Sequence, residues 1–351
     1  MILVKGEGTC RGNTKVNRNI TYDILRVLAC VMIVAMHSPL PSEQANGALV
    51  SALSYLTAPG IGLFFMISGA LLLPIKQGTS FFLKKRFTKM LYPTLFWSFF
   101  YLCVNEWLRG DEISWGRSLL SLPFSTQGNP VLWFMYTLLG LYLLAPILSR
   151  WLQAASLREL SFYMGLWAIT LCYPLLRYIV DVNTDNTGVL YYFTGYVGYF
   201  VLGYYLKRNP RLFPMKWSFF AFGVALGVPI ACKLLGYQVD FYDLFWYLSI
   251  FVVIQCIFWW LIIRRIQGVG RFASSLTLLS NLSFGIYLVH IFVMRYILWH
   301  WSVILNIGNH ALQTLTIASL TFIISALVSY IISLVPGSQY LIGYKRATNG
   351  Q

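Results

Sequence analysis

The sequence predicts an all-α integral membrane protein with about ten transmembrane helices and both termini in the cytoplasm. Three observations predict this fold: an apolar composition, ten apolar runs, and basic residues that alternate between the loops. Of the 351 residues, 58% are hydrophobic and 11% are charged, whereas a soluble domain is about 45–50% apolar and about 25% charged. This excess goes beyond what a large soluble core requires, so a polytopic membrane protein is the expected class.

The apolar runs set the number of helices, because a hydrocarbon core of about 30 Å requires roughly 20 residues per helix. Ten runs are candidates, and they cover residues 22–41, 49–74, 88–108, 130–149, 160–180, 188–206, 217–236, 241–263, 282–301 and 312–335. The seventh run is the weakest, since it contains Gly223, Gly227 and Pro229.

The basic residues set the orientation, because Lys and Arg concentrate in cytoplasmic loops. With the N-terminus in the cytoplasm, 20 of the 26 Lys and Arg residues fall on the inner side and five on the outer side. The net charge of +15 is therefore mostly a topology signal, and no nucleic-acid motif accompanies it. The expected organisation is one membrane domain (residues 21–336) between cytoplasmic tails (residues 1–20 and 337–351).

The first run, YDILRVLACVMIVAMHS, contains two ionisable residues eleven positions apart, Arg26 and His37. Eleven residues exceed three full helical turns by about 20°, so both side chains share one face, roughly 16 Å apart along the axis. Ionisable groups in membranes usually face an interior cavity. Histidine can take a proton from an alcohol, and arginine can hold a phosphate or stabilise an oxyanion. The pair suits acyl transfer to a hydroxyl, although snorkelling of Arg26 and simple packing of His37 are alternatives.

Asp23 lies three residues before Arg26 in the same run. Two roles are open for it. Its carboxylate can pair with Arg26 on the helix surface, or it can face the positive end of the helix dipole.

A second basic group, in FLKKRFTKMLYP, stands at the cytoplasmic start of the third run. Lys85, Arg86 and Lys89 are candidates for binding the phosphates of a cytosolic cofactor, with Arg86 and Lys89 on one helical face. The positive-inside rule explains the same charges without a ligand.

Other candidates are aromatic or small. Tyr287 and His290, at i and i+3 in SFGIYLVH, lie well inside the ninth run and either line a cavity or form an interhelical hydrogen bond. Trp133 either lines a cavity or sits at the outer interface. Ser68 and Gly69 predict a close helix contact.

No metal cofactor is expected. The six cysteines have no CxxC spacing, and no HExxH, Walker or dinucleotide-binding motif occurs.

These segments together resemble the acyltransferase-3 family of integral membrane acyltransferases, which is similar to bacterial O-acetyltransferases of surface polysaccharides. The resemblance extends over about residues 20–335 and rests on five segments in order: DILRVLACVMIVAMH, FFMISG, FLKKRFTKMLYP, LWFMYTLLGLYLLAPIL and SFGIYLVH.

The resemblance implies about ten helices in one membrane domain, an essential pair at Arg26 and His37, and a cytosolic acyl-CoA donor, usually acetyl-CoA. It also implies a glycan or lipid-linked sugar as acceptor and a place in the bacterial cytoplasmic membrane. The family's Arg-x-x-Arg motif reads Arg86-Phe-Thr-Lys89 here, which keeps the charge but loses one bidentate fork.

The predicted function is acyl transfer from acyl-CoA to a glycan hydroxyl, with His37 as base or transient acyl carrier and Arg26 as its partner. The alternative is a transporter or flippase of a glycolipid or acyl group that forms no ester, since buried ionisable residues also occur in transporters. The chain shows no obvious internal repeat of the kind common in transporters. No particular oligomeric state is predicted.

Overall fold

The computed structural model describes residues 18–41, 48–110, 112–176, 179–180, 187–210, 214–237, 246–266 and 268–346. Every regular element in these ranges is a helix, which confirms the predicted all-α class. Most of the predicted N-terminal tail lies outside the described residues, as do residues 347–351. The α-helices are α1 (Ile20–His37), α2 (Ala48–Thr57), α3 (Pro59–Leu72), α4 (Thr79–Arg109), α5 (Trp115–Ser121), α6 (Trp133–Ala154), α7 (Leu157–Leu171), α8 (Tyr173–Leu176), α9 (Val197–Arg208), α10 (Met215–Leu234), α12 (Ile250–Ile263), α13 (Ala273–Phe292), α14 (Ser302–Leu305), α15 (His310–Leu334) and α16 (Gln339–Ile342).

Six of the described helical segments are long and apolar enough to cross a membrane. They are Ile20–His37, Val50–Leu72, Pro130–Ala154, Met215–Cys232, Gly270–His300 and His310–Leu334. The other four predicted runs also contain helices. Three of these, α7, α9 and α12, have 15, 12 and 14 residues, or about 18–23 Å at 1.5 Å per residue. The fourth, α4, has 31 residues but carries a basic cluster near its start.

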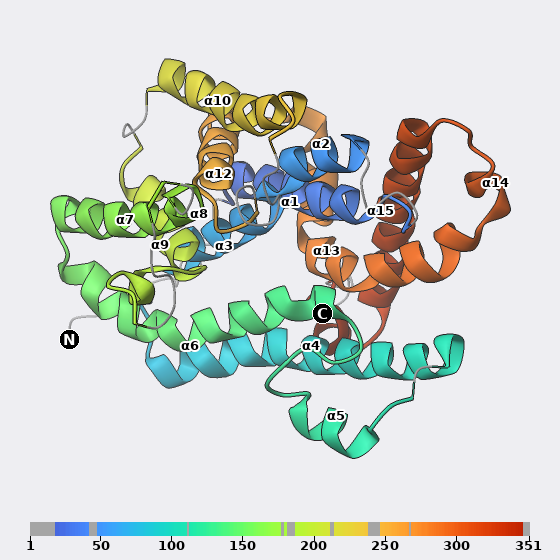
Figure 1. Cartoon of the computed structure of the whole chain (residues 1–351). Helices are drawn as coiled ribbons and strands as arrows, with labels where there is room; N and C mark the ends of the chain where they lie inside the picture. Colours follow the sequence, from blue (N-terminus) through green and yellow to red (C-terminus); the bar gives the residue numbers. More distant parts are fainter. Residues whose placement is uncertain are drawn as a thin grey trace, which may run out of the picture.

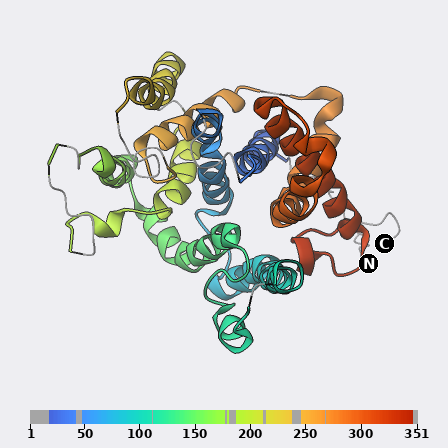
Figure 2. The same ribbon diagram turned by 45° about the vertical axis from the view of Figure 1, so that its right-hand side comes forward.

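Helix α1 occupies the centre of the molecule. It contacts α3, α12, α13 and α15, and Figure 2 shows it between α3 on one side and α13 and α15 on the other. Helices α4 and α6 run side by side along another edge (Figure 1). The buried core therefore surrounds the helix that carries Arg26 and His37.

Helices α3 and α9 pack through glycines at backbone distance. A Cβ added at Gly69 would lie 1.7 Å from the carbonyl oxygen of Phe200, and one at Gly203 would lie 1.8 Å from that of Met66. Only glycine permits such an approach. The close helix contact predicted at Ser68 and Gly69 is confirmed at Gly69, with α9 as the partner, whereas Ser68 lines a cavity.

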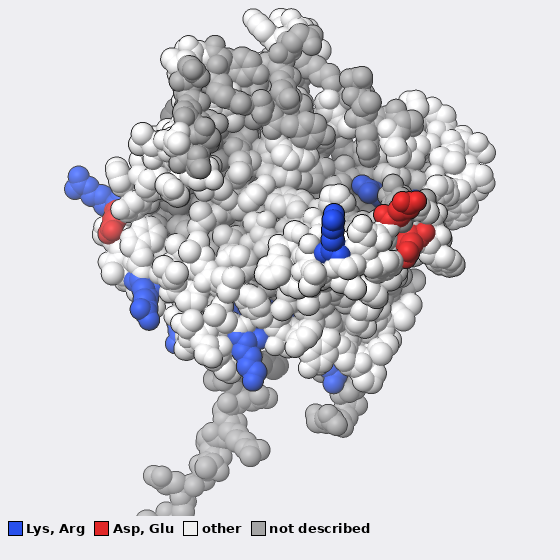
Figure 3. Space-filling view, turned by 60° about the horizontal axis from the view of Figure 1, so that its bottom comes forward, with Lys and Arg blue, Asp and Glu red and all other residues white. Residues whose placement is uncertain are grey.

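Helix α15 has an apolar outer face and a polar inner face. Leu315, Ile323 and Leu327 are more than half exposed, whereas Thr321 and Ser325 are fully buried. This inverts the pattern of a surface helix in water and suits a helix that faces lipid. Figure 3 likewise shows one face of the molecule on which charged side chains are few.

Candidate functional site

A cavity of about 290 Å³, the central cavity, opens between the helices around α1. Residues of α1, α3, α4, α6 and α13 line it, together with Gly343 and Tyr344 just after α16. Helix α16, in the segment predicted as a C-terminal tail, packs against α4, and the Trp97 indole donates to the carbonyl of Leu341 at 2.9 Å. The lining residues are Arg26, Phe64, Ser68, Arg86, Lys89, Met90, Phe134, Met135, Leu138, Tyr142, Ser280, Asn281, Ser283, Phe284, Tyr287, Gly343 and Tyr344.

Three predicted cations meet in the central cavity: Arg26 from α1, and Arg86 and Lys89 from α4. No Asp or Glu stands among the described residues that line it. The Arg86 Nε is buried and finds no hydrogen-bond partner among the described residues. Unneutralised cations around a partly apolar cavity make a binding site for an anion.

A second cavity, the basic cavity, adjoins the first at Arg86. It measures about 650 Å³ and is lined by the segment Leu71–Gln77, Phe82, Arg86, Tyr204, Lys207 and Arg208. The Lys207 ammonium donates to the carbonyl of Ala70 at 2.6 Å. Partial burial, and then the nearby Lys76, lower the pKa of Lys207. Because Arg86 lines both cavities, a long polyanionic ligand can contact both.

Lys85 lies apart from these cavities. Its side chain is exposed, and its Nζ stands 5.8 Å from the centre of the Phe81 ring. Lys85 is not among the described residues that line either of the two cavities. The structure thus separates Lys85 from Arg86 and Lys89.

His37 ends α1, beyond the central cavity, and its ring lies against His290 of α13, with 5.6 Å between centroids. The same distance separates His290 from Tyr287, which lines the central cavity. A row of three rings therefore connects the cavity to His37. The shared face predicted for Arg26 and His37 agrees with these contacts, since both side chains meet α13, Arg26 at Ser280 and His37 at His290.

His290 is fully buried. Its Nδ1 lies 2.5 Å from the Tyr287 carbonyl oxygen, and since a carbonyl only accepts, Nδ1 carries the proton. The Nε2 is then an acceptor, and the described residues supply no hydrogen-bond partner for it. A buried acceptor beside His37 is therefore free to receive a proton donor.

The other two aromatic candidates differ in their contacts. The Tyr287 hydroxyl donates to the carbonyl of Val131. The Trp133 ring does not appear among the described residues of the central cavity and packs against Tyr196 and Tyr247, at 5.1 and 5.6 Å between centroids.

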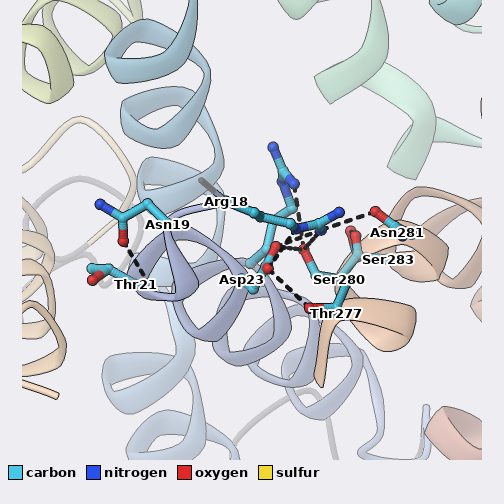
Figure 4. Close-up of polar contacts among 9 residues, drawn as sticks. Arg18, Asn19, Thr21, Asp23, Thr277, Ser280, Asn281 and Ser283 are labelled. Atoms are coloured by element: carbon cyan, nitrogen blue, oxygen red, sulfur yellow. Dashed lines mark hydrogen bonds and ion pairs between the residues drawn. The ribbon is translucent and has the colours of Figure 1, made fainter. Parts of the chain in front are cut away.

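Asp23 does not pair with Arg26 as a direct ion pair. The ion pair that the structure describes for its carboxylate is with Arg18, whose Nε and Nη2 donate to Oδ2 and Oδ1 at 2.7 and 2.6 Å. Ser280 and Thr277 of α13 also donate to the carboxylate (Figure 4). Asp23 does lie in the first turn of α1, at the positive end of the helix dipole, as the second alternative predicted. Its burial, however, results from these contacts with α13.

The site also includes three residues that the sequence pattern does not single out: Arg18, Ser280 and Asn281. Serines and asparagines in an apolar helix resemble packing residues, and only the rotation of α13 turns these two toward the cavity. Within the described parts of the chain, no group of three or more His, Cys, Asp and Glu residues could hold a metal ion.

One comparison with known proteins identifies the family. The model of the acyltransferase-3 family, described as an acyltransferase domain, matches residues 19–334. No curated protein and no solved structure matches the chain. The match covers nearly the whole chain, and the family together with the apolar helices makes this an integral, multi-pass membrane protein. The chain therefore belongs to the acyltransferase-3 family of membrane acyltransferases.

Proposed function

We propose that this protein transfers an acyl group, with acetyl as the expected case, from cytosolic acyl-CoA to a hydroxyl of a cell-surface or lipid-linked glycan. The observation that carries the proposal is the convergence of Arg26, Arg86 and Lys89 on a cavity whose described lining has no carboxylate. Tyr287 and His290 join that cavity to His37.

The proposed topology has ten spans, both termini in the cytoplasm, and the bacterial inner membrane as location. In such a topology, any two odd-numbered spans cross the membrane in the same direction, and so do any two even-numbered spans. The first and ninth spans contain α1 and α13, where Arg26, Cys30 and His37 meet Ser280, Ser283 and His290 in the same chain direction. Two separate fusions to the C-terminus test the topology. If the C-terminus is cytoplasmic, a fused fluorescent protein fluoresces, whereas a fused reporter enzyme that is active only in the periplasm shows no activity.

The donor enters from the cytosolic side in this proposal. Its phosphates contact Arg86 and Lys89, and the basic cavity, with Lys76, Lys207 and Arg208, extends the positive surface for its nucleotide end. Arginine and lysine are the usual ligands of phosphate groups. Lys85 contributes only to the surrounding field, because it is not among the described residues that line either cavity.

The acyl group then moves along the contact between helices α1 and α13 toward His37. In direct transfer, His37 removes the proton of the acceptor hydroxyl, whose oxygen bonds to the thioester carbon. The carbon–sulfur bond breaks, and CoA leaves with the proton that His37 returns. In two-step transfer, the His37 nitrogen attacks the thioester carbon, the carbon–sulfur bond breaks, and CoA leaves with the imidazole proton. The hydroxyl oxygen then attacks the acyl carbon, the carbon–nitrogen bond breaks, and the hydroxyl proton returns to the imidazole. Arg26 holds the donor or the developing negative charge.

The acceptor would reach His37 from the outer half of the membrane. Aromatic residues surround that end: the Tyr247 hydroxyl contacts the Met36 sulfur at 3.5 Å, and Trp246 and Trp133 pack on Tyr247. Aromatic side chains combine a flat apolar face with a polar tip, and this combination suits a sugar.

The test is an assay of purified full-length protein in nanodiscs with acetyl-CoA carrying a labelled acetyl group and lipid-linked glycans from the native membrane. Formation of a labelled glycan ester, found by mass spectrometry together with free CoA, supports the proposal. A transporter gives a different result, since it would move label into proteoliposomes without forming any ester. That outcome would replace acyl transfer with transport.

A further inference from the structure

We infer that Asp23 and Ser280 are positioning residues that fix the Arg26 guanidinium at the wall of the central cavity while leaving its charge available to a ligand. The inference rests on the proposed function, since it assigns a purpose to the Arg26 charge. It is carried by a chain of hydrogen bonds that joins α1 to α13 and back.

Asp23 is a buried acidic residue of α1. Its carboxylate is 2% exposed, and a buried carboxylate is costly unless it is paired and hydrogen-bonded. Arg18 forms a bidentate ion pair with this carboxylate, with nitrogen–oxygen distances of 2.7 and 2.6 Å, and bidentate pairs are the strong ones. Arg18 thus balances the charge of Asp23, so Asp23 does not use up the charge of Arg26.

The Ser280 hydroxyl links Asp23 to Arg26. A hydroxyl has one proton to donate and two lone pairs to accept with. The Ser280 hydroxyl donates to Asp23 Oδ1 at 2.6 Å. Serines in helices commonly donate to the carbonyl four residues earlier, and Asp23 instead turns this proton toward α1.

Arg26 donates a hydrogen bond to Ser280. Its Nη1 lies 3.3 Å from the Ser280 oxygen, and a guanidinium only donates, so Ser280 must accept. Because its proton already points at Asp23, Ser280 accepts with its lone pairs, from Arg26 and, at 3.5 Å, also from Arg18 Nη2. Both Arg26 and Ser280 line the central cavity, whereas Asp23 and Thr277 line a different cavity, which Arg18 also lines.

Figure 4 shows the Asp23 carboxylate bound both to Arg18 and to Ser280 and Thr277 of α13. A carboxylate bound directly to Arg26 would neutralise it. A neutral serine oxygen holds the guanidinium in place and keeps its full charge for a phosphate or an oxyanion. This is a positioning role, because the described residues show no hydrogen bond between Asp23 and Arg26, and Asp23 acts on Arg26 through Ser280 and through its nearby charge.

The test measures the Kd of CoA by calorimetry with purified full-length protein in detergent. Ser280→Ala and Asp23→Asn are each expected to weaken CoA binding about tenfold, as loss of a hydrogen bond to a charged group does. Arg26→Ala is expected to weaken it at least as much. In an Arg26→Ala background, Ser280→Ala and Asp23→Asn should cause no further loss, since residues that act only through Arg26 have no effect without it.

Two further variants control for folding. Ser280→Thr keeps the hydroxyl and should retain the Kd of the natural protein, whereas Ser275→Ala makes the same change as Ser280→Ala at an exposed position of α13 and should not alter it. Thermal unfolding is measured for every variant.

The outcomes separate the two proposals. A natural protein that does not bind CoA overturns the proposed function and this inference together. If the natural protein binds CoA but the losses from Arg26→Ala and Ser280→Ala simply add, or if Ser280→Ala binds normally, the positioning role alone is overturned.

Discussion

The imidazole rings of His37 and His290 lie against each other, with 5.6 Å between their centroids and 38° between their planes. They come from α1 and α13, which are distant in the sequence and adjacent in the fold. His290 offers an acceptor nitrogen at full burial, so His37 has a neighbour that can orient it through a hydrogen bond.

Replacing His37 should stop the chemistry and leave donor binding intact. His37→Ala is expected to lower transfer by 100-fold or more, as loss of a general base does, at about 10²–10⁴. The Kd of CoA should change little, because His37 lies beyond the central cavity. Mass spectrometry of surface glycans from cells carrying only the variant measures the effect. His310→Ala, at the exposed start of α15, is the matched control. Normal acylation by His37→Ala would contradict the assignment.

Replacing His290 tests the ring contact. His290→Ala removes the buried acceptor and should lower kcat about tenfold while the Kd of CoA stays within about twofold, an expectation based on the loss of one orienting hydrogen bond. His290→Gln, whose amide can both donate and accept, should retain more activity than His290→Ala. Steady-state kinetics of the purified variants provide the measurement. Equal activity of the two variants and the natural protein would show that His290 only fills space.

Arg86 and Lys85 are adjacent in sequence and differ in placement. Arg86→Ala should weaken CoA binding at least tenfold, since Arg86 lines both cavities and charged hydrogen bonds contribute about 1.5–3 kcal/mol. Lys85→Ala should weaken it less than about threefold, because exposed charges contribute about 0–1 kcal/mol. Titration calorimetry at two salt concentrations measures both. A larger loss of CoA binding from Lys85→Ala than from Arg86→Ala would place the phosphates at the exposed side chain of Lys85 and away from both cavities.

The α3–α9 contact is a test of the fold. Gly69→Ala would place a methyl group 1.7 Å from the Phe200 carbonyl oxygen, and overpacking of this kind costs about 1–3 kcal/mol or more. A lower thermal unfolding temperature in detergent is expected, with less protein recovered from the membrane. Gly140→Ala meets nothing within 4 Å and should leave the unfolding temperature within about 2 °C. Similar unfolding temperatures for both variants would mean that α3 and α9 are not closely packed.

The sequence predicted the helical class, and its clearest local result was the shared face of Arg26 and His37. Helical periodicity depends only on the chain itself, so a spacing of eleven residues is sufficient to align two side chains. The family match over residues 19–334 confirms the resemblance drawn from five short segments. Composition also showed that basic residues gather at the start of α4, although it did not separate Lys85 from Arg86.

The partners of these residues were decided only by the tertiary structure. The pairing of Asp23 with Arg18, the contact of Ser280 with Arg26 and the approach of His290 to His37 each depend on how α1 and α13 are rotated about their axes. That rotation depends on packing between segments remote in sequence, such as the close contact of Gly60 in α3 with Ala29 of α1 and that of Gly285 in α13 with Ser329 of α15. By itself, the sequence determined which residues could share a face of a helix. Packing decided what those faces meet, because a contact between two helices requires both surfaces at once.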